Sequence, residues 1–402
     1  MGRHQMRTLQ EEELRAAYDL FLRAVLQRPS TDEQWSHLRA RFETGRVLGA
    51  FVDDELAGTA LTTSSAVVVP GGRKLPAGAV TGVAVRPDRT RRGILTGLMH
   101  AQLDDARQRN EPLAMLHASE AVIYERFGYG VATRARMVEI NRIRTQFRDE
   151  VPRKGRVHLL ELSAATRVLP EIYRDRVLAR PGQIERTDGW WKSRLGMLST
   201  GALVVVHQTD DGTYDGFAVY EPKSIEDAFD VAESQLQVHD LQAADSAVAA
   251  SLWRFLLDID LVNQVRVVDR PLDEPLELWL TDRRQCRTVA TYDDLWLRLV
   301  DVETALQQRA FGSAEPVTIE VADSMLPTNS GCYRISGQGV ERSTGQPQLS
   351  MDVATLASLY LGDHPVSRMV EAGRIQVHDA EAVPRAEELF RTGRLPWCGT
   401  NF

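Results

Sequence analysis

The stretch VAVRPDRTRRGIL, residues 83–95, decides the fold class of this chain. Its β-branched start is typical of a strand end, and the turn Arg91–Gly93 leads at once into a helix that begins at Ile94. A helix start of this kind presents free backbone N–H groups and the positive end of the helix dipole. Because glycine permits a close approach and the arginines add charge, the stretch predicts a diphosphate site. Taken alone, an exposed basic turn before an ordinary helix is an equal alternative.

The segment LHASEAVIYERFGYG, residues 116–130, is the second informative stretch. We expect a strand over Leu113–Ala118, followed by a helix over Glu120–Phe127 that Ser119 caps. Gly128 should end this helix in the left-handed conformation, which places Tyr124 on a short helix soon after the basic turn. Together the two segments indicate an enzyme that uses acyl-coenzyme A.

The composition is that of a soluble globular protein. A length of 402 residues predicts two or three domains. The first residues carry no apolar signal core and no run of about 18 apolar residues occurs, so we expect a cytoplasmic protein without a membrane partner. The net charge of −8 argues against nucleic-acid binding and favours a cationic substrate. The three cysteines lie far apart and the nine histidines lack ligand spacing, so we expect neither disulfides nor a metal.

The order of elements in the first part of the chain predicts a mixed α/β domain. Helices are expected from Leu14 to before Pro29 and from Ile94 onward. The expected strands before the second helix are Gln5–Leu9, Val47–Val52, Leu56–Thr63 and Ala77–Val85.

A similar order begins again near Val157, but without the basic glycine turn. Where this second copy should bind phosphate, the sequence reads QAADSA over residues 242–247. Asp245 would meet a diphosphate with the wrong charge, so we expect this half to bind no cofactor. A third region starts near Pro316, with an expected strand over Val317–Val321 and helices over Asp352–Leu361 and Pro365–Glu371.

The first two segments resemble the Gcn5-related N-acetyltransferase (GNAT) superfamily. Residues 116–130, LWLRL at 295–299 and LASLYLG at 356–362 narrow the resemblance to the enhanced intracellular survival (Eis) acetyltransferases, over nearly the whole chain. This resemblance implies an α/β architecture with tandem GNAT folds at residues 1–150 and 151–300, the second inactive. A domain similar to sterol carrier protein is implied at residues 301–402. The resemblance also implies acetyl-CoA as cosubstrate, a polycationic amine such as an aminoglycoside as acceptor, and a homohexamer.

The resemblance further assigns two catalytic roles. Tyr124 is the implied general acid, because a phenol with a pKa near 10 stays protonated at neutral pH. The terminal carboxylate of Phe402 is the implied base, which draws the ammonium in and relays its proton through water. A packed tyrosine and a phenylalanine that only fills an apolar slot are the structural alternatives. The backbone N–H of Val85 is expected to polarise the thioester carbonyl. The residues expected to contact the cofactor are Val83, Ala84, Val85, Arg91, Arg92, Gly93, Ile94, Leu95, Thr96, Ser119 and Glu120.

Two positions depart from the superfamily pattern. Thr90 stands where arginine or glutamine is usual, and its loss of charge should weaken cofactor binding by about 1 kcal/mol. Leu95 replaces a small residue, although leucine suits the Eis branch.

On the substrate side, Trp35 is expected to form a pocket wall. Asp32 and Glu33 either attract cations or lie in a solvated loop.

The sequence also allows other interpretations of individual residues and of the function. The pair Trp190–Trp191 could stack a sugar, but a place in the core is more common for such a pair. His117 next to Ser119 lacks the Gly-x-Ser-x-Gly elbow of a nucleophile. An apolar-ligand or lipid-binding protein with a vestigial acetyltransferase half, and a protein lysine acetyltransferase, are the alternative functions.

Overall fold

The computed structural model describes residues 5–223 and 234–402, which form three β-sheets. The first residues of the N-terminus, on which the expected absence of a signal segment partly depends, lie outside this range. Among the described residues, no helix combines the length and the apolar character that crossing a bilayer requires.

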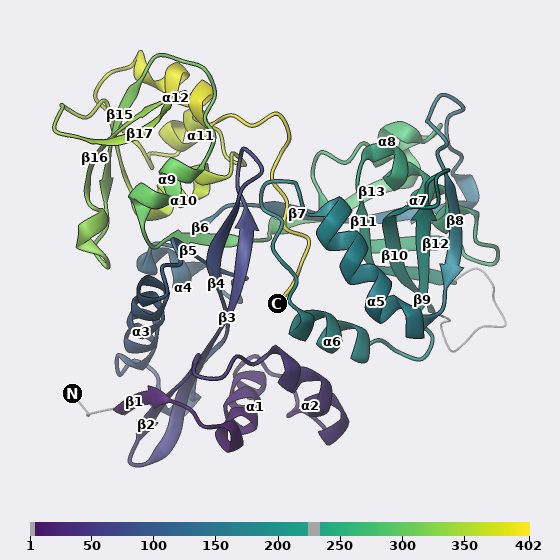
Figure 1. Ribbon diagram of the computed structural model, residues 1–402, viewed down its shortest axis with the longest axis horizontal. Coiled ribbons are helices and arrows are strands. Elements are labelled where there is room, and N and C mark those ends of the chain that lie inside the picture. The colour runs from purple at the N-terminus through teal and green to yellow at the C-terminus, as the bar shows by residue number, and fades with distance from the viewer. Residues whose placement is uncertain (1–4, 224–233) are drawn as a thin grey trace. The chain divides into compact units, whose positions relative to one another are not determined.

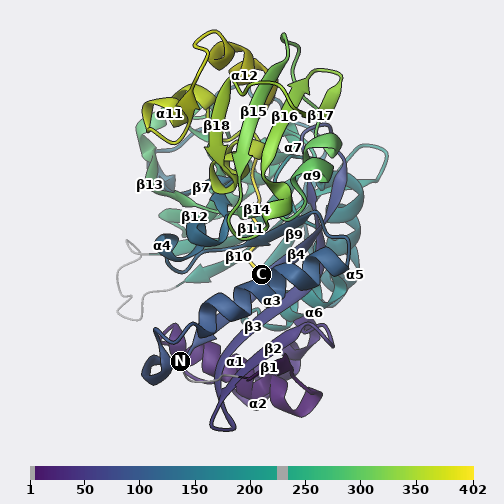
Figure 2. The same ribbon diagram turned by 90° about the vertical axis from the view of Figure 1, so that its left-hand side faces the viewer.

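The first sheet has the strand order β1-β2-β3-β4-β5-β14-β6 (Figure 1). Its strands are β1 Gln5–Thr8, β2 Val47–Val52, β3 Glu55–Val68, β4 Lys74–Val85, β5 Leu113–Leu116, β6 Gly130–Val131 and β14 Trp296–Leu299. The helices of this part are α1 Leu14–Ala24, α2 Asp32–Leu38, α3 Ile94–Gln108 and α4 Ala121–Tyr124, with 3₁₀ turns at Glu11–Glu13, Arg39–Arg41, Pro87–Arg89 and Glu125–Phe127. Figure 2 shows α3 lying across the sheet beside β2, β3 and β4.

The strands and helices expected before residue 118 are all present, with ends shifted by a few residues. The segment after α1 differs, because it forms helix α2 and not a loop. Thr31 and Gln34 form a reciprocal capping box at its start, a signal that the Thr-x-x-Gln spacing carries. The mixed α/β fold class is confirmed.

The second sheet has the order β13-β7-β12-β11-β10-β9-β8. Its strands are β7 Arg134–Asn141, β8 Arg156–Leu160, β9 Leu203–Gln208, β10 Tyr214–Lys223, β11 Gln235–Ala243, β12 Gln264–Pro271 and β13 Cys286–Asp293. The accompanying helices are α5 Leu162–Ile172, α7 Ser246–Asp258 and α8 Leu276–Trp279, with a π turn at Tyr173–Val177 and 3₁₀ turns at Arg142–Arg144 and Arg283–Gln285.

Two strands do not follow the chain order. β7 comes directly after β6 in the sequence but lies between β12 and β13 of the second sheet, whereas β14 lies between β5 and β6 of the first. The first sheet thus includes one strand, β14, from far along the chain, whereas the strands of the second sheet, β7 to β13, are consecutive in the sequence. One compact unit holds the chain up to Thr133 together with residues 180–193 and 293–402, and the other holds residues 134–179 and 194–292. The domain boundaries expected at residues 150 and 300 stay a prediction.

The third sheet has the order β17-β16-β15-β18-β19 and belongs to the first compact unit. Its elements are β15 Val317–Ala322, β16 Gly331–Ser336, β17 Gly339–Ser343, β18 Leu349–Asp352, β19 Gln376–Val377, α9 Val302–Gln308, α10 Val353–Tyr360, α11 Val366–Glu371, α12 Ala382–Phe390 and a 3₁₀ turn at Pro327–Asn329. Every residue of α10 is buried.

The third sheet and the first share one hydrophobic core. Leu113, Leu297 and Leu356 are fully buried members of the same cluster. At Gly130 a side chain would lie 2.0 Å from the Ala354 carbonyl oxygen, so only glycine lets β6 approach α10 this closely. The buried pair Arg298–Asp323, with both side chains almost fully enclosed, also joins the two parts.

Candidate active site

The site begins where strands β4 and β5 part. They pair in parallel only at Ala77–Ala79, so the edge of β4 that follows is not paired with β5. On its other edge β4 carries a bulge, because Gly82 and Val83 lie opposite a single residue of β3, with Gly82 at a φ of 57°. Free strand-edge groups at such a gap are suited to bind an extended amide chain.

The basic turn lies at the end of β4, where the sequence predicts it. Gly93 has a φ of 81° and caps α3 in the left-handed conformation, with no atom within 4 Å of where a side chain would start. The next N–H groups, at Ile94, Leu95 and Thr96, have no carbonyl one turn back in the helix. Arg91 and Arg92 are exposed, so this turn can receive a diphosphate.

Tyr124 lies in the buried cluster that lines the diverging strands. This cluster includes Val80 and Leu116, and Val83 and Leu95 pack against it. Burial raises the pKa of Tyr124, a hydrogen bond with the Ser119 side chain lowers it, and the charge of Glu120 raises it further, with a net increase. The hydroxyl therefore stays protonated through the neutral range and can act as a proton donor.

The expected helix cap at Ser119 is wrong. Helix α4 begins at Ala121, Glu120 takes the N-cap position, and no side chain caps it. The reason is that the Ser119 hydroxyl interacts with the hydroxyl of Tyr124 instead. Gly128 does end the segment in the left-handed conformation, as expected, with a φ of 82°.

A cavity of about 260 Å³ lies in the same compact unit. Its wall is mostly apolar and aromatic, with Tyr18, Phe42 and Trp190 among its members. Thr81 of β4 and Phe402 also line it, which connects the cavity to the strand that bears the bulge. The ionisable side chains on its wall, besides Tyr18, are Glu185 and Arg41.

The C-terminal segment reaches this cavity through a series of specific hydrogen bonds. One Asp294 oxygen accepts from the backbone N–H groups of Cys398 and Gly399, at 3.1 and 3.3 Å, and from the Thr133 hydroxyl at 3.0 Å. The Trp397 N–H donates to the carbonyl of Pro181 at 2.8 Å. Asp294 is almost fully buried, so these bonds fix the tail from inside the core.

Residues 180–193 hold the last part of the tail. The Arg186 guanidinium donates to the Thr400 hydroxyl at 3.0 Å, and the Trp190 indole donates to the Asn401 carbonyl at 2.7 Å. The Thr81 hydroxyl donates to the carbonyl oxygen of Phe402 at 3.2 Å. In this way the last residue of the sequence lies beside β4 (Figure 1).

His117 follows β5 and completes this arrangement. Its Nε2 lies 3.0 Å from the Thr400 carbonyl oxygen, and its ring packs on that of Phe402 with centroids 4.8 Å apart. Sequence patterns alone could not place His117 at the site, because its contacts, Thr400 and Phe402, come from the far end of the chain. The same holds for Thr81, Glu185, Arg186 and Asp294.

The other predicted residues lie as follows. Trp35 does not line the cavity; it packs on Tyr18 and Phe42, which do, with ring centroids at 6.2 and 5.2 Å. Trp190 and Trp191 are buried, as the core interpretation expects. Trp190 also lines the cavity.

In the second sheet, Asp245 occupies the position that corresponds to the basic turn. Its carboxylate caps α7 by accepting from the Val248 N–H at 2.9 Å, and Lys154 lies 3.1 Å away. A fixed carboxylate at this helix start opposes a diphosphate, which is the physical basis of the prediction that this half binds no cofactor.

Comparison with known protein families gives three matches along the chain. A model described as an acetyltransferase (GNAT) domain matches residues 5–132, a second one described in the same way matches residues 182–299, and a sterol carrier protein domain matches residues 302–399. The expected tandem architecture is thereby confirmed.

Comparison with individual proteins gives relatives over most of the chain. An uncharacterised N-acetyltransferase of Streptomyces coelicolor is 34% identical, covering 98% of this chain and 99% of its own. The N-acetyltransferase Eis of Mycobacterium tuberculosis is 30% identical over 85% of each chain. The crystal structure of Eis1 from Mycobacterium abscessus superposes with a TM-score of 0.90 at 37% identity, covering all of both chains.

Proposed function

The chain belongs to the Eis N-acetyltransferases of the GNAT superfamily, and on this premise we propose that it transfers the acetyl group of acetyl-CoA directly to an amine of a small polycationic molecule. The GNAT fold implies the use of acetyl-CoA. The observation that carries the proposal is that Phe402 and Thr81 line one cavity, so that a carboxylate and the bulged strand face the same space.

Binding of acetyl-CoA follows from the backbone of β4 and α3. The turn Arg91–Gly93 and the first N–H groups of α3 hold the diphosphate, and the free edge of β4 receives the pantetheine arm. The Val85 N–H polarises the thioester carbonyl, as its position after the bulge allows. Bound in this way, the acetyl group is proposed to reach the cavity that Thr81 and Phe402 line.

The transfer needs one proton removed and one supplied. The amine attacks the carbonyl carbon, the new N–C bond forms and the C–S bond breaks. The Phe402 carboxylate takes the proton that the amine loses, directly or through water, and the Tyr124 hydroxyl donates a proton to the departing thiolate. The protonated state that the raised pKa of Tyr124 maintains is the state this step needs.

The acceptor is proposed to carry at least two ammonium groups. Within the cavity wall, the carboxylates are the terminal one of Phe402 and that of Glu185, so one receives the reacting amine and the other a second cation. The apolar remainder of the wall fits the carbon framework between them. A homohexamer, implied by the resemblance, is proposed as the assembled state.

The test is release of free CoA from acetyl-CoA in the presence of an amine panel: an aminoglycoside, an arylalkyl monoamine and a lysine-containing peptide. The protein should carry no tag after Phe402. Turnover with the aminoglycoside above that with the other two supports the proposal, and turnover with the peptide alone would favour the lysine acetyltransferase. Tight binding of acetyl-CoA without turnover of any amine would contradict acetyl transfer altogether.

A further inference from the structure

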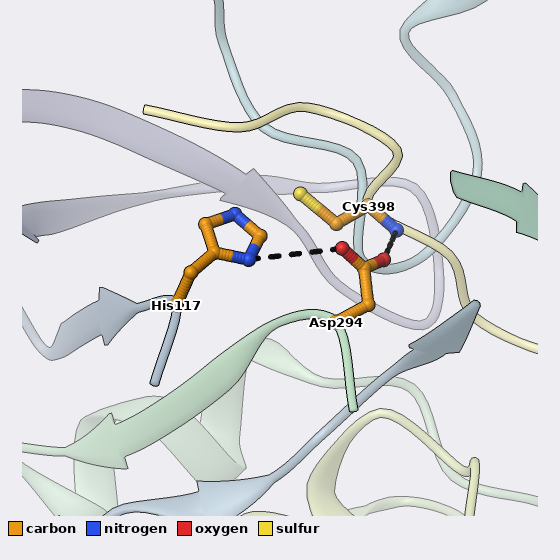
Figure 3. Close-up of side chains that lie close together, drawn as sticks. All are labelled: His117, Asp294 and Cys398. Carbon is orange, nitrogen blue, oxygen red and sulfur yellow. Dashed lines mark hydrogen bonds and ion pairs between the residues drawn. The ribbon is translucent and has the colours of Figure 1, made fainter. Parts of the chain in front are cut away.

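His117, Asp294 and Cys398 bring three different ligand atoms together beside the active site. An imidazole nitrogen, a carboxylate oxygen and the thiol sulfur all lie within 4.8 Å of one another. Figure 3 shows the carboxylate and the thiol turned toward the imidazole ring. The three residues come from the end of β5, the start of β14 and the C-terminal tail, so the fold alone assembles this group.

The hydrogen bonds around the cluster determine which atoms face its centre. The carbonyl oxygen of Thr400 carries no proton, so the Nε2 of His117, 3.0 Å away, must be the N–H donor. In the neutral ring, Nδ1 then carries the lone pair, and it lies 3.8 Å from Oδ1 of Asp294. At this distance one ion can bind both atoms after a small movement of the side chains.

The outer contacts are those that orient the ligands of a metal ion. A ligating histidine donates its second N–H to a carbonyl or carboxylate, as His117 does to Thr400. The second oxygen of Asp294 accepts from the N–H groups of Cys398 and Gly399, which fixes the orientation of the carboxylate beside His117. Asp294 and Cys398 are buried and the His117 side chain is 21% exposed, so His117 is the member of the cluster that solvent reaches.

We propose that His117, Asp294 and Cys398 form a binding site for one zinc ion. A set with one nitrogen, one oxygen and one sulfur ligand is typical of Zn²⁺ and unsuited to Mg²⁺ or Ca²⁺, which take oxygen ligands. Ligand atoms around tetrahedral zinc lie roughly 3.3–3.8 Å apart, so side-chain rotations of about 1 Å close the cluster. On binding, the Cys398 thiol releases its proton to solvent and its sulfur bonds to the metal as a thiolate.

Zinc at this position would act on the C-terminal tail. Cys398 lies close in the chain to Phe402, and His117 contacts both the Thr400 carbonyl and the Phe402 ring. A metal that joins His117 and Asp294 to Cys398 therefore fixes the segment that carries the terminal carboxylate. The proposal concerns metal binding itself, so it stands or falls independently of acetyl transfer.

Cobalt(II) substitution tests the site on the full-length protein. Metal-free protein is titrated with Co²⁺, and the absorption spectrum is recorded. We expect a thiolate-to-cobalt charge-transfer band in the near ultraviolet, intense visible bands of a tetrahedral ion, saturation at one ion per chain, and loss of all bands on addition of Zn²⁺. A spectrum without the charge-transfer band would overturn the proposal.

Single substitutions identify the ligands. Cys398→Ser should abolish the charge-transfer band, and His117→Gln should lower the apparent affinity at least tenfold. Cys286→Ser and Cys332→Ser are the matched controls, since neither thiol belongs to the cluster and both replacements should leave the spectrum unchanged. Circular dichroism and the melting temperature show that each variant is folded. A band that survives Cys398→Ser would assign the metal to another thiol, and this too would overturn the proposal.

Discussion

One contact of Tyr124 changes the structural role expected for Ser119. The sequence predicts a tyrosine on a short helix that Ser119 caps, and the tyrosine is indeed on α4, buried against Val80 and Leu116. The cap is absent because the serine hydroxyl interacts with the phenol. Ser119 therefore bonds to the proposed proton donor, Tyr124, and does not cap the helix, a distinction that local propensity cannot make.

Replacing Tyr124 with phenylalanine should lower kcat for acetyl transfer by about 10²- to 10⁴-fold, because the thiolate loses its proton donor. The dissociation constant for acetyl-CoA should change little, because the ring remains in place. CoA release and calorimetric titration measure the two quantities. In the wild-type enzyme the raised pKa keeps the phenol protonated, so the rate should not fall from loss of this proton until the pH exceeds 10. Wild-type activity in the variant would remove Tyr124 from the mechanism.

Glu185 should determine the preference for acceptors with two amines. Glu185→Gln removes one of the cavity's two carboxylates while keeping the shape of the side chain. We expect KM for a diamine to rise about tenfold, because one exposed charge-assisted contact is lost. KM for a monoamine should stay unchanged. Steady-state kinetics with a matched pair of amines measure the difference. Equal effects on both amines would contradict the second-ammonium role.

At the scale of helices and strands, the sequence predicted those features that depend only on residues close together in the chain. The strand before the basic turn, the α3 start at Ile94 and the left-handed Gly128 are all local features, and all are present. The bulge at Gly82 carries no local signal, because it is defined by pairing with β3. The exchange of β7 and β14 was equally hidden, since strand order depends on contacts between segments far apart in the chain.

The turn before α3 should bind acetyl-CoA through backbone and not through side-chain packing. Gly93→Ala forces a side chain into a φ of 81°, at a cost of about 1 kcal/mol, and narrows the approach to the first N–H groups of the helix. We expect KM for acetyl-CoA to rise about tenfold. Gly373→Ala is the control, with a φ of 69° and similarly open surroundings in the third domain. It should lower the free energy of unfolding by a similar amount without changing KM, and an equal KM effect would refute the interpretation.

Arg298 on β14 forms hydrogen bonds with two other segments, the one after β15 and the 3₁₀ turn after α4. Its guanidinium makes two bonds of 2.7 Å with Asp323 and donates to the Phe127 carbonyl, next to α4. Arg298→Met leaves the Asp323 carboxylate buried without a counter-charge, so the free energy of unfolding should fall by about 3–5 kcal/mol. Denaturant unfolding measures this. The double variant Arg298→Met/Asp323→Asn removes the charge and keeps an acceptor for the backbone N–H groups of Met325 and Leu326, so it should recover part of the loss. A double variant no more stable than the single one would show that the charge is not the cause.

At the scale of the whole molecule, the proposed active site combines residues that lie far apart in the sequence. The acetyl-CoA part comes from one continuous run of residues, which is why the sequence revealed it. The proposed acceptor part combines Thr81, Glu185 and Phe402, with the tail held by contacts to Asp294 and Arg186. Those contacts link segments separated by a hundred residues or more, and no spacing rule describes them. The core shared with the third sheet gives that sheet a role in holding the tail.

Adding a single alanine after Phe402 is the sharpest test of this architecture. The extension converts the terminal carboxylate into an amide and moves the charge one residue away, while the anchors at Cys398, Thr400 and Asn401 can all remain. We expect kcat to fall at least a hundredfold, with unchanged acetyl-CoA affinity and a melting temperature within a few degrees of wild type. Phe402→Leu is the matched control: it retains the terminal carboxylate and loses only the aromatic contact with His117, so its activity should stay within about tenfold. If the extended protein turned over normally, the terminal carboxylate could not be the base, and the tail would serve only to close the cavity.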